Sequence, residues 1–73
     1  MMELDVRGEI CPYPMMKAVE AMRALPEGEY LEVYTDHSPC LDTIPTQAAR
    51  LGFETSIEKI GSPEWRITFR RKP

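Results

Sequence analysis

The chain has 73 residues, of which 42% are hydrophobic and 29% are charged. This composition is typical of a globular domain, and the length excludes a catalytic domain joined to a separate regulatory one. Nine basic and twelve acidic residues give a net charge of −3, which argues against binding to nucleic acid or anionic membranes by bulk attraction. The two cysteines are too few for a disulfide-stabilised scaffold.

The N-terminal segment has neither a basic stretch nor an apolar run, so we expect no signal peptide. No segment approaches the roughly 18 apolar residues that a membrane-spanning helix needs. We therefore expect residues 1–73 to form a single cytoplasmic domain that does not insert into a membrane and whose thiols are reduced.

The pattern predicts a short first strand at Leu4 and Val6, closed by Gly8, followed by a helix. In that helix, apolar residues recur at helical spacing on one face, and charged residues lie opposite. The apolar residues are Met15, Ala18, Val19, Met22 and Leu25. The Pro-Glu-Gly sequence at residues 26–28 ends the helix.

Residues 30–35 alternate between apolar and polar side chains, which is typical of a strand with one buried face. Residues 53–60 are rich in β-branched and aromatic side chains, and Gly61-Ser62-Pro63 separates them from the last strand. In that strand the expected core residues are Trp65, Ile67 and Phe69. The two runs predict an antiparallel hairpin.

Between these strands, Ile44 to Leu51 predicts a second helix, ended by Gly52 at the C′ position. A proline inside a helix loses a hydrogen bond and clashes with the preceding turn. We therefore place Pro45 in the first turn, with Thr43 or Asp42 as the cap.

This β-α-β-α-β-β order predicts an α/β (α+β) two-layer sandwich. Right-handed crossovers would place both helices on one face of a mixed four-stranded sheet. Because the first two strands are then parallel, the loops that follow them should emerge at the same edge of the sheet.

The strongest functional signal is Cys11-Pro12-Tyr13-Pro14. Prolines are tolerated in a first helical turn, so Cys11 should lie at or beside the N-cap, where the helix dipole favours a reactive thiolate. The alternative is that Cys11 packs as a small hydrophobic residue, while Pro12 and Pro14 only define the helix start. Tyr13 and Met16 are candidates for a partner-binding surface or are simple surface residues.

A Cys-Pro-x-Pro motif at the first helix of such a domain resembles the TusA/SirA/YeeD family of sulfur carriers. The resemblance runs from residues 4–8, through residues 11–14, to Ile44-Pro45. It implies that Cys11 accepts sulfane sulfur as a persulfide and passes it to another protein. The hairpin at residues 60–68 looks more like the YeeD branch, whose members are associated with thiosulfate breakdown and a YeeE-type membrane thiosulfate transporter.

Lys17 can stabilise a persulfide anion or attract an anionic donor such as thiosulfate; otherwise it is a solvated lysine. Cys40, on the loop after the second strand, is expected near Cys11, either as a resolving thiol or as a buried cysteine. His37 shares that edge as a proton donor or an ordinary loop residue. Cys11, His37 and Cys40 match no metal-binding spacing, so we expect neither a metal nor a cofactor.

We therefore expect a monomeric sulfur-transfer protein that exchanges sulfur with donor and acceptor proteins and does not bind nucleic acid directly. One alternative is a stand-alone thiosulfate-cleaving enzyme, with Cys40 or an external thiol releasing the product. The other is a partner-binding domain in which Cys11 is unreactive. The basic residues 70–72 are expected to be solvated.

Overall fold

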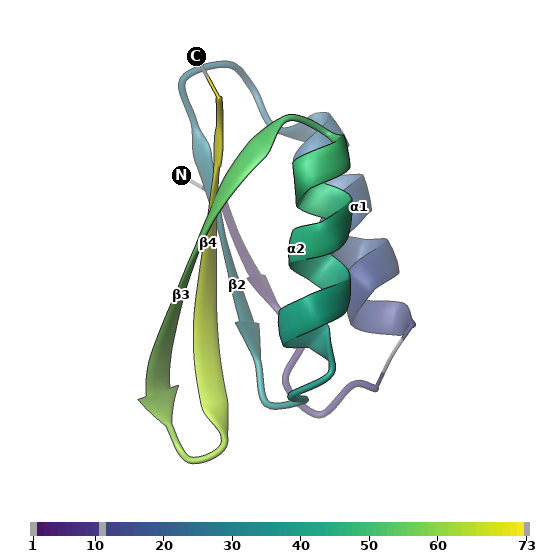
Figure 1. The fold of residues 1–73 in the computed structure, drawn as a ribbon, viewed down its shortest axis with the longest axis vertical. Coiled ribbons are helices and arrows are strands. Elements are labelled where there is room, and N and C mark those ends of the chain that lie inside the picture. The colour runs from purple at the N-terminus through teal and green to yellow at the C-terminus, as the bar shows by residue number, and fades with distance from the viewer. Residues whose placement is uncertain (1, 11, 73) are drawn as a thin grey trace.

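The computed structural model describes residues 2–10 and 12–72. Its elements follow the predicted order (Figure 1). They are β1 (Met2–Asp5), α1 (Tyr13–Ala24), β2 (Tyr30–Thr35), α2 (Cys40–Arg50), β3 (Phe53–Gly61) and β4 (Glu64–Arg71). Over the part of the chain described, neither helix is long and apolar enough to cross a membrane.

The four strands form one mixed sheet in the order β1-β2-β4-β3. β1 is parallel to β2, and β4 is antiparallel to both β2 and β3. Both helices cover the same face of the sheet (Figure 1), as right-handed crossovers require. The predicted two-layer α/β sandwich is confirmed.

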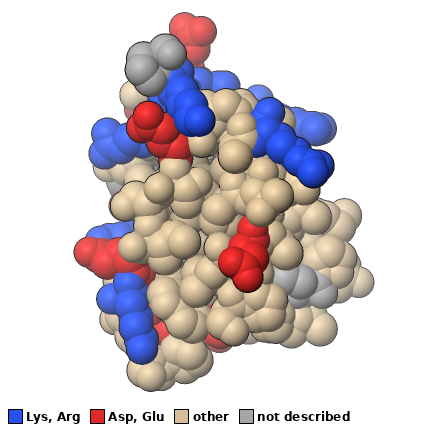
Figure 2. Space-filling model, viewed as in Figure 1, with Lys and Arg blue, Asp and Glu red and all other residues tan. Residues whose placement is uncertain are grey.

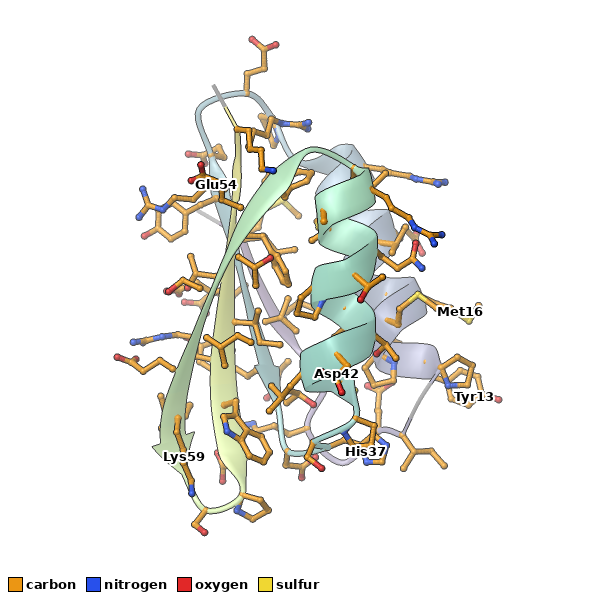
Figure 3. The ribbon with its side chains drawn as sticks, viewed as in Figure 1. Tyr13, Met16, His37, Asp42, Glu54 and Lys59 are labelled. Carbon is orange, nitrogen blue, oxygen red and sulfur yellow. The ribbon has the colours of Figure 1, made fainter. Side chains whose placement is uncertain are left out.

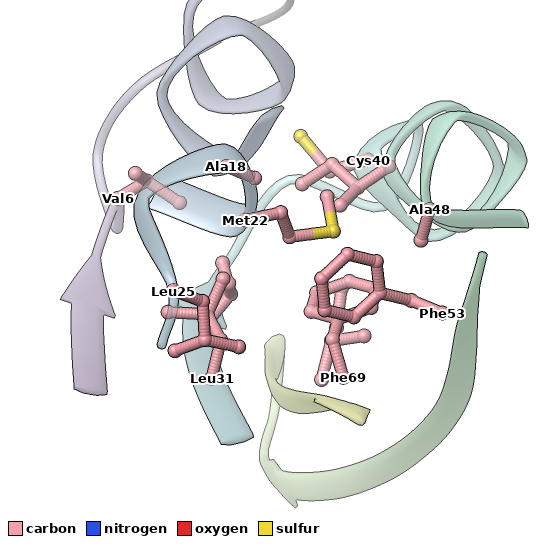
Figure 4. Close-up of a cluster of buried hydrophobic side chains, with 12 residues drawn as sticks. Val6, Ala18, Met22, Leu25, Leu31, Cys40, Ala48, Phe53 and Phe69 are labelled. Carbon is pink, nitrogen blue, oxygen red and sulfur yellow. The ribbon is translucent and has the colours of Figure 1, made fainter. Parts of the chain in front are cut away.

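The hydrophobic core lies between this helical layer and the sheet (Figure 4). Each large side chain buried there stabilises the fold by about 1.5–3 kcal/mol. Its members are Val6, Ala18, Met22, Leu25, Leu31, Val33, Cys40, Ile44, Ala48, Phe53, Ile67 and Phe69. Trp65, expected in the core, is only partly buried. It pairs with Lys59 near the hairpin end, which extends past the helices (Figure 1).

The start of the second helix differs from the prediction. α2 begins at Cys40 rather than near Ile44, and its N-cap residue is Pro39, so neither Thr43 nor Asp42 is the cap. The extra turn is favoured because it brings Cys40 onto the same buried face as Ile44, four residues further along. Cys40 therefore belongs to the helix and not to the preceding loop.

Pro45 consequently lies inside α2 and not in its first turn. The helix lacks one backbone donor at this point. Burial of Cys40, Ile44 and Ala48 along one face offsets that loss, since these side chains form part of the core. The predicted end of the helix is confirmed: Gly52 follows the C-cap residue with φ +84°, a conformation that glycine adopts without strain.

Candidate functional site

Two loops meet at the end of the sheet where β1 and β2 finish: residues 6–10 and residues 36–39. The backbone N–H of Gly8 in the first loop donates a hydrogen bond of 2.9 Å to the Asp36 carboxylate in the second. The expectation that both loops emerge at the same edge is confirmed. Asp36 therefore connects the loop at Gly8 to the end of β2.

The first loop begins with a tight turn. The backbone N–H of Glu9 donates to the Val6 carbonyl over 3.2 Å, and Gly8 lies between them with φ +84°. A positive φ at the third residue of a turn is the arrangement that glycine permits and other residues resist. The sequence Val-Arg-Gly-Glu thus fixes the direction in which the chain approaches Cys11.

Arg7 anchors this turn to the sheet. Its guanidinium donates to Asp5 over 2.8 Å and to Glu64 of β4 over 3.0 Å. The hydrogen bond from Arg7 lowers the pKa of Asp5 from 3.8 to about 2, and the contact with Asp5 raises the pKa of Arg7. The charge of Arg7 is therefore balanced by two carboxylates, and its side chain has a structural contact on each side.

The start of α1 has the predicted proline arrangement. Pro12 is the N-cap residue, and Pro14 is buried in the first turn. In the described residues of this helix start, no side chain caps the backbone and no acidic residue occupies the first turn. The positive end of the helix dipole is thus not neutralised by a carboxylate there, and a nearby anion would be stabilised. Cys11 directly precedes Pro12 in the sequence and lies outside the described residues, so its role stays a prediction.

Three exposed apolar side chains lie at or next to this helix start. Ile10, Tyr13 and Met16 are 63%, 59% and 56% exposed, the highest values among the large hydrophobic residues described. Tyr13 and Met16 project away from the helices (Figure 3), and the described side chains visible at this corner are uncharged (Figure 2). Met16 also lines a groove of about 440 Å³ with Met15 and Val19. Such clustering marks an interaction site more often than scattered exposed residues do.

Lys17 forms an ion pair across the loop. Its Nζ lies 2.7 Å from Oε1 of Glu9, and the lysine side chain is about half exposed. Glu9 was not identified from the sequence, because an eight-residue separation across a loop has no periodic signature. Its position two residues before Cys11 was the only available signal. A role for Lys17 toward sulfur stays a prediction.

Cys40 lies at the predicted end of the sheet but inside the protein. Its side chain is completely buried and projects between the two helices, beside Ala18 and Met22 (Figure 4). Burial in an apolar environment disfavours the charged thiolate. A nucleophilic attack by Cys40 would therefore require the start of α2 to move.

His37 lies on the second loop and is partly buried. Its backbone N–H donates to Oγ1 of Thr35 over 3.2 Å, which continues β2 into the loop. Within residues 2–10 and 12–72, no three His, Cys, Asp or Glu side chains are grouped so that they could hold a metal ion.

Several known proteins are similar to this chain in sequence. The chain is 36% identical over 70 residues to a protein of Archaeoglobus fulgidus that is named as a sulfur carrier, covering 94% of this chain and 80% of that protein. A sulfur carrier so named in Thermotoga maritima is 40% identical over 70 residues, covering 94% and 89%. YedF of Escherichia coli, also named as a sulfur carrier, is 44% identical over 50 residues, covering 68% and 65%.

The fold has a solved counterpart in a SirA-like protein of Desulfitobacterium hafniense. The TM-score is 0.86, at 21% sequence identity, covering 94% of this chain and 95% of that one. Assignment to the YeeD branch stays a prediction. The family model described as sulfurtransferase TusA matches residues 2–71. The chain therefore belongs to the TusA family of sulfurtransferases.

Proposed function

We propose that this protein carries sulfane sulfur as a persulfide on Cys11 and passes it to a partner protein. The observation that carries the proposal is the start of α1: the residue after Cys11 is the N-cap residue of a helix whose first turn holds no carboxylate. A thiolate or persulfide anion is stabilised at such a position. The relatives named as sulfur carriers support the same function.

The chemistry consists of two thiol exchanges. The Cys11 thiolate attacks the outer sulfur of a donor persulfide, a new S–S bond forms, and the donor leaves as its thiolate. An acceptor thiolate then attacks the outer sulfur on Cys11, which restores the Cys11 thiolate and yields the acceptor persulfide. Each exchange depends on the thiolate fraction, on the leaving group and on access to the sulfur.

Within this function, we assign thiosulfate as a small-molecule donor. The Cys11 thiolate would attack its outer sulfur, the S–S bond of thiosulfate would break, and sulfite would leave with the bonding electron pair. A membrane transporter of the YeeE type is then a candidate neighbour that supplies thiosulfate. The acceptor is a thiol of another protein.

Release of sulfur is assigned to an external thiol and not to Cys40. The Cys40 side chain is completely buried in the core. A resolving attack would expose it by opening the start of α2. A stand-alone enzyme would therefore need an external thiol to release the sulfur. Release by Cys40 would first require the start of α2 to open.

The exposed side chains of Ile10, Tyr13 and Met16 form the proposed contact surface for donor and acceptor proteins. A carrier must bring its sulfur into the active sites of larger proteins, and a projecting apolar corner beside Cys11 suits that task. Because a persulfide exchanged with a small donor needs no such surface, loading and delivery can be measured separately.

The test is intact-mass spectrometry after incubation with a persulfide donor, and separately with thiosulfate. The wild type is expected to gain the mass of one sulfur atom, and Cys11→Ala is expected to gain none. Cys40→Ala is the matched control and should load like the wild type. Loading of Cys11→Ala, or no loading of the wild type by any donor, would contradict persulfide formation at Cys11. The partner-binding domain with an unreactive Cys11 would then be the remaining function.

A sulfide assay separates the carrier from the stand-alone enzyme. Purified protein is incubated with thiosulfate and a small thiol reductant, and sulfide is measured over many turnovers. Because the small thiol is itself an external thiol, the carrier is expected to release sulfide in a reaction that needs Cys11 but does not need Cys40. Sustained production that needs both Cys11 and Cys40 would establish the enzyme and contradict the assignment of release to an external thiol.

A further inference from the structure

Glu9 and Lys17, which lie on either side of Cys11 in the sequence, form an ion pair. Its two charged atoms are 2.7 Å apart, and the side chains are 30% and 52% exposed. Glu9 precedes Cys11 by two residues, and Lys17 follows it by six. Opposite charges from the two sides of Cys11 in the sequence are thus held together.

The other charged groups at this end of the protein have separate contacts. Arg7 is bound by Asp5 and Glu64, and the Asp36 carboxylate accepts the backbone N–H of Gly8. His37 lies on the neighbouring loop and is partly buried. Glu9 and Lys17 therefore form a pair that can be changed without removing any of these anchors.

We propose that Glu9 is a positioning residue that binds the Lys17 ammonium and thereby limits how strongly its positive charge acts on the Cys11 sulfur. A Lys17 that is bound to Glu9 contributes a nearly neutral pair, whereas a Lys17 released from Glu9 contributes a full positive charge. The inference rests on the proposed function only in its assignment of Cys11 as the reactive group.

Two single variants distinguish this role from that of a structural contact. Glu9→Gln and Lys17→Gln both break the ion pair, so a structural contact alone predicts the same change in both. Their effects on charge are opposite, because one leaves the lysine and the other leaves the carboxylate. The readout is the rate of Cys11 alkylation by iodoacetamide as a function of pH, followed by intact mass.

The pH midpoint of alkylation is expected to fall in Glu9→Gln and to rise in Lys17→Gln. Each shift should be roughly half a pH unit, the size expected for one charge several ångströms away in a water-rich surrounding. Lys17→Arg, which keeps the charge and can bind Glu9, should restore the wild-type midpoint. Glu20→Gln, which removes a carboxylate from the exposed side of α1, is the control and should leave the midpoint unchanged.

Shifts of the same sign in Glu9→Gln and Lys17→Gln, or no shift in either, would overturn the proposal. Thermal unfolding followed by circular dichroism establishes that each variant is folded. Because alkylation needs no sulfur donor, opposite shifts together with a failure of persulfide loading would support this inference and contradict the proposed function. Normal persulfide loading together with shifts of the same sign would support the proposed function and contradict this inference.

Discussion

The two helices begin at the same end of the protein, and each has a proline as its N-cap residue and a cysteine next to that proline. In α1 the order is Cys11-Pro12, and in α2 it is Pro39-Cys40. The reversed order places Cys40 at the first helical position, where its side chain lies in the core. Cys11 instead precedes the cap and follows Ile10, which is the most exposed large hydrophobic residue described.

The surroundings of the two starts differ in charge as well as in burial. The first turn of α2 contains Asp42, which compensates the positive end of its helix dipole, whereas the described first turn of α1 contains no acidic residue. One helix start is therefore suited to packing and the other to an anion. A cysteine that follows a proline cap, as Cys40 does, lies two positions further along than one that precedes it, and this places its side chain in the core.

The largest expected effect is a difference in alkylation between the two cysteines. In the native protein, Cys11 should react readily, whereas Cys40 should react only when the start of α2 opens. A core thiol protected by several kcal/mol of opening free energy reacts slower by a factor of about a thousand or more. Mass spectrometry of the alkylated protein measures both rates, and comparable rates would remove the distinction between the two helix starts.

The next effect concerns stability. Cys40→Ser should lower the free energy of unfolding by about 1 kcal/mol or more, because a hydroxyl costs more to bury in the core than a thiol does. Cys11→Ser is the matched substitution and should stay within about 0.5 kcal/mol of the wild type. Urea unfolding measures both, and equal losses for the two variants would contradict the assignment of one structural and one surface cysteine.

A smaller effect is expected at the apolar corner. Changing both Tyr13 and Met16 to Ser should slow sulfur delivery to a protein acceptor about tenfold, the result of losing roughly 1.4 kcal/mol of contact energy. Loading of Cys11 from a small persulfide should be unchanged. The matched control is Ile57→Ser, an exposed apolar residue of β3. Slower loading in the double variant would mean that the corner shapes the Cys11 segment itself.

The smallest effect comes from Asp5, whose pKa is lowered from 3.8 to about 2 by the hydrogen bond from Arg7. A carboxyl whose pKa is lower in the folded state stabilises the fold above its unfolded pKa, and this contribution is lost as the pH falls through the folded pKa. Asp5→Asn should therefore be less stable than the wild type above pH 4, and the gap should close toward pH 2.

Urea unfolding across that pH range, at low and at high salt, measures this gap. Salt should reduce the gap, because the pair is exposed to solvent. A gap that does not depend on pH would show that the Asp5 side chain stabilises the turn by hydrogen bonding alone.

Most of the fold could be predicted from the sequence because its signals are local. Alternation along β2 and β4, helical spacing along α1 and the glycine that ends α2 each follow from a few neighbouring residues. The start of α2 was missed for the same reason. Pro45 is a strong local signal against a helix interior, but it is outweighed by the burial of Cys40 and Ile44, which depends on α1 and the sheet.

The candidate site could be predicted only in part. The sheet topology predicted that the loops after the first two strands lie together, and the hydrogen bond from Gly8 to Asp36 confirms this for residues 6–10 and 36–39. The pairing of Glu9 with Lys17 and of Arg7 with Glu64 could not be predicted. Both join side chains whose meeting depends on the exact path of a loop, and no spacing rule covers such a path.

The position of β4 between β2 and β3 has a consequence for synthesis on the ribosome. The Cys11 segment emerges early, yet β2 and β3 have no strand between them until β4 has been made. Glu64, which binds Arg7 in the turn before Cys11, is the first residue of that late strand. In a nascent chain, the turn at Arg7 therefore lacks its contact with Glu64 until β4 has left the exit tunnel.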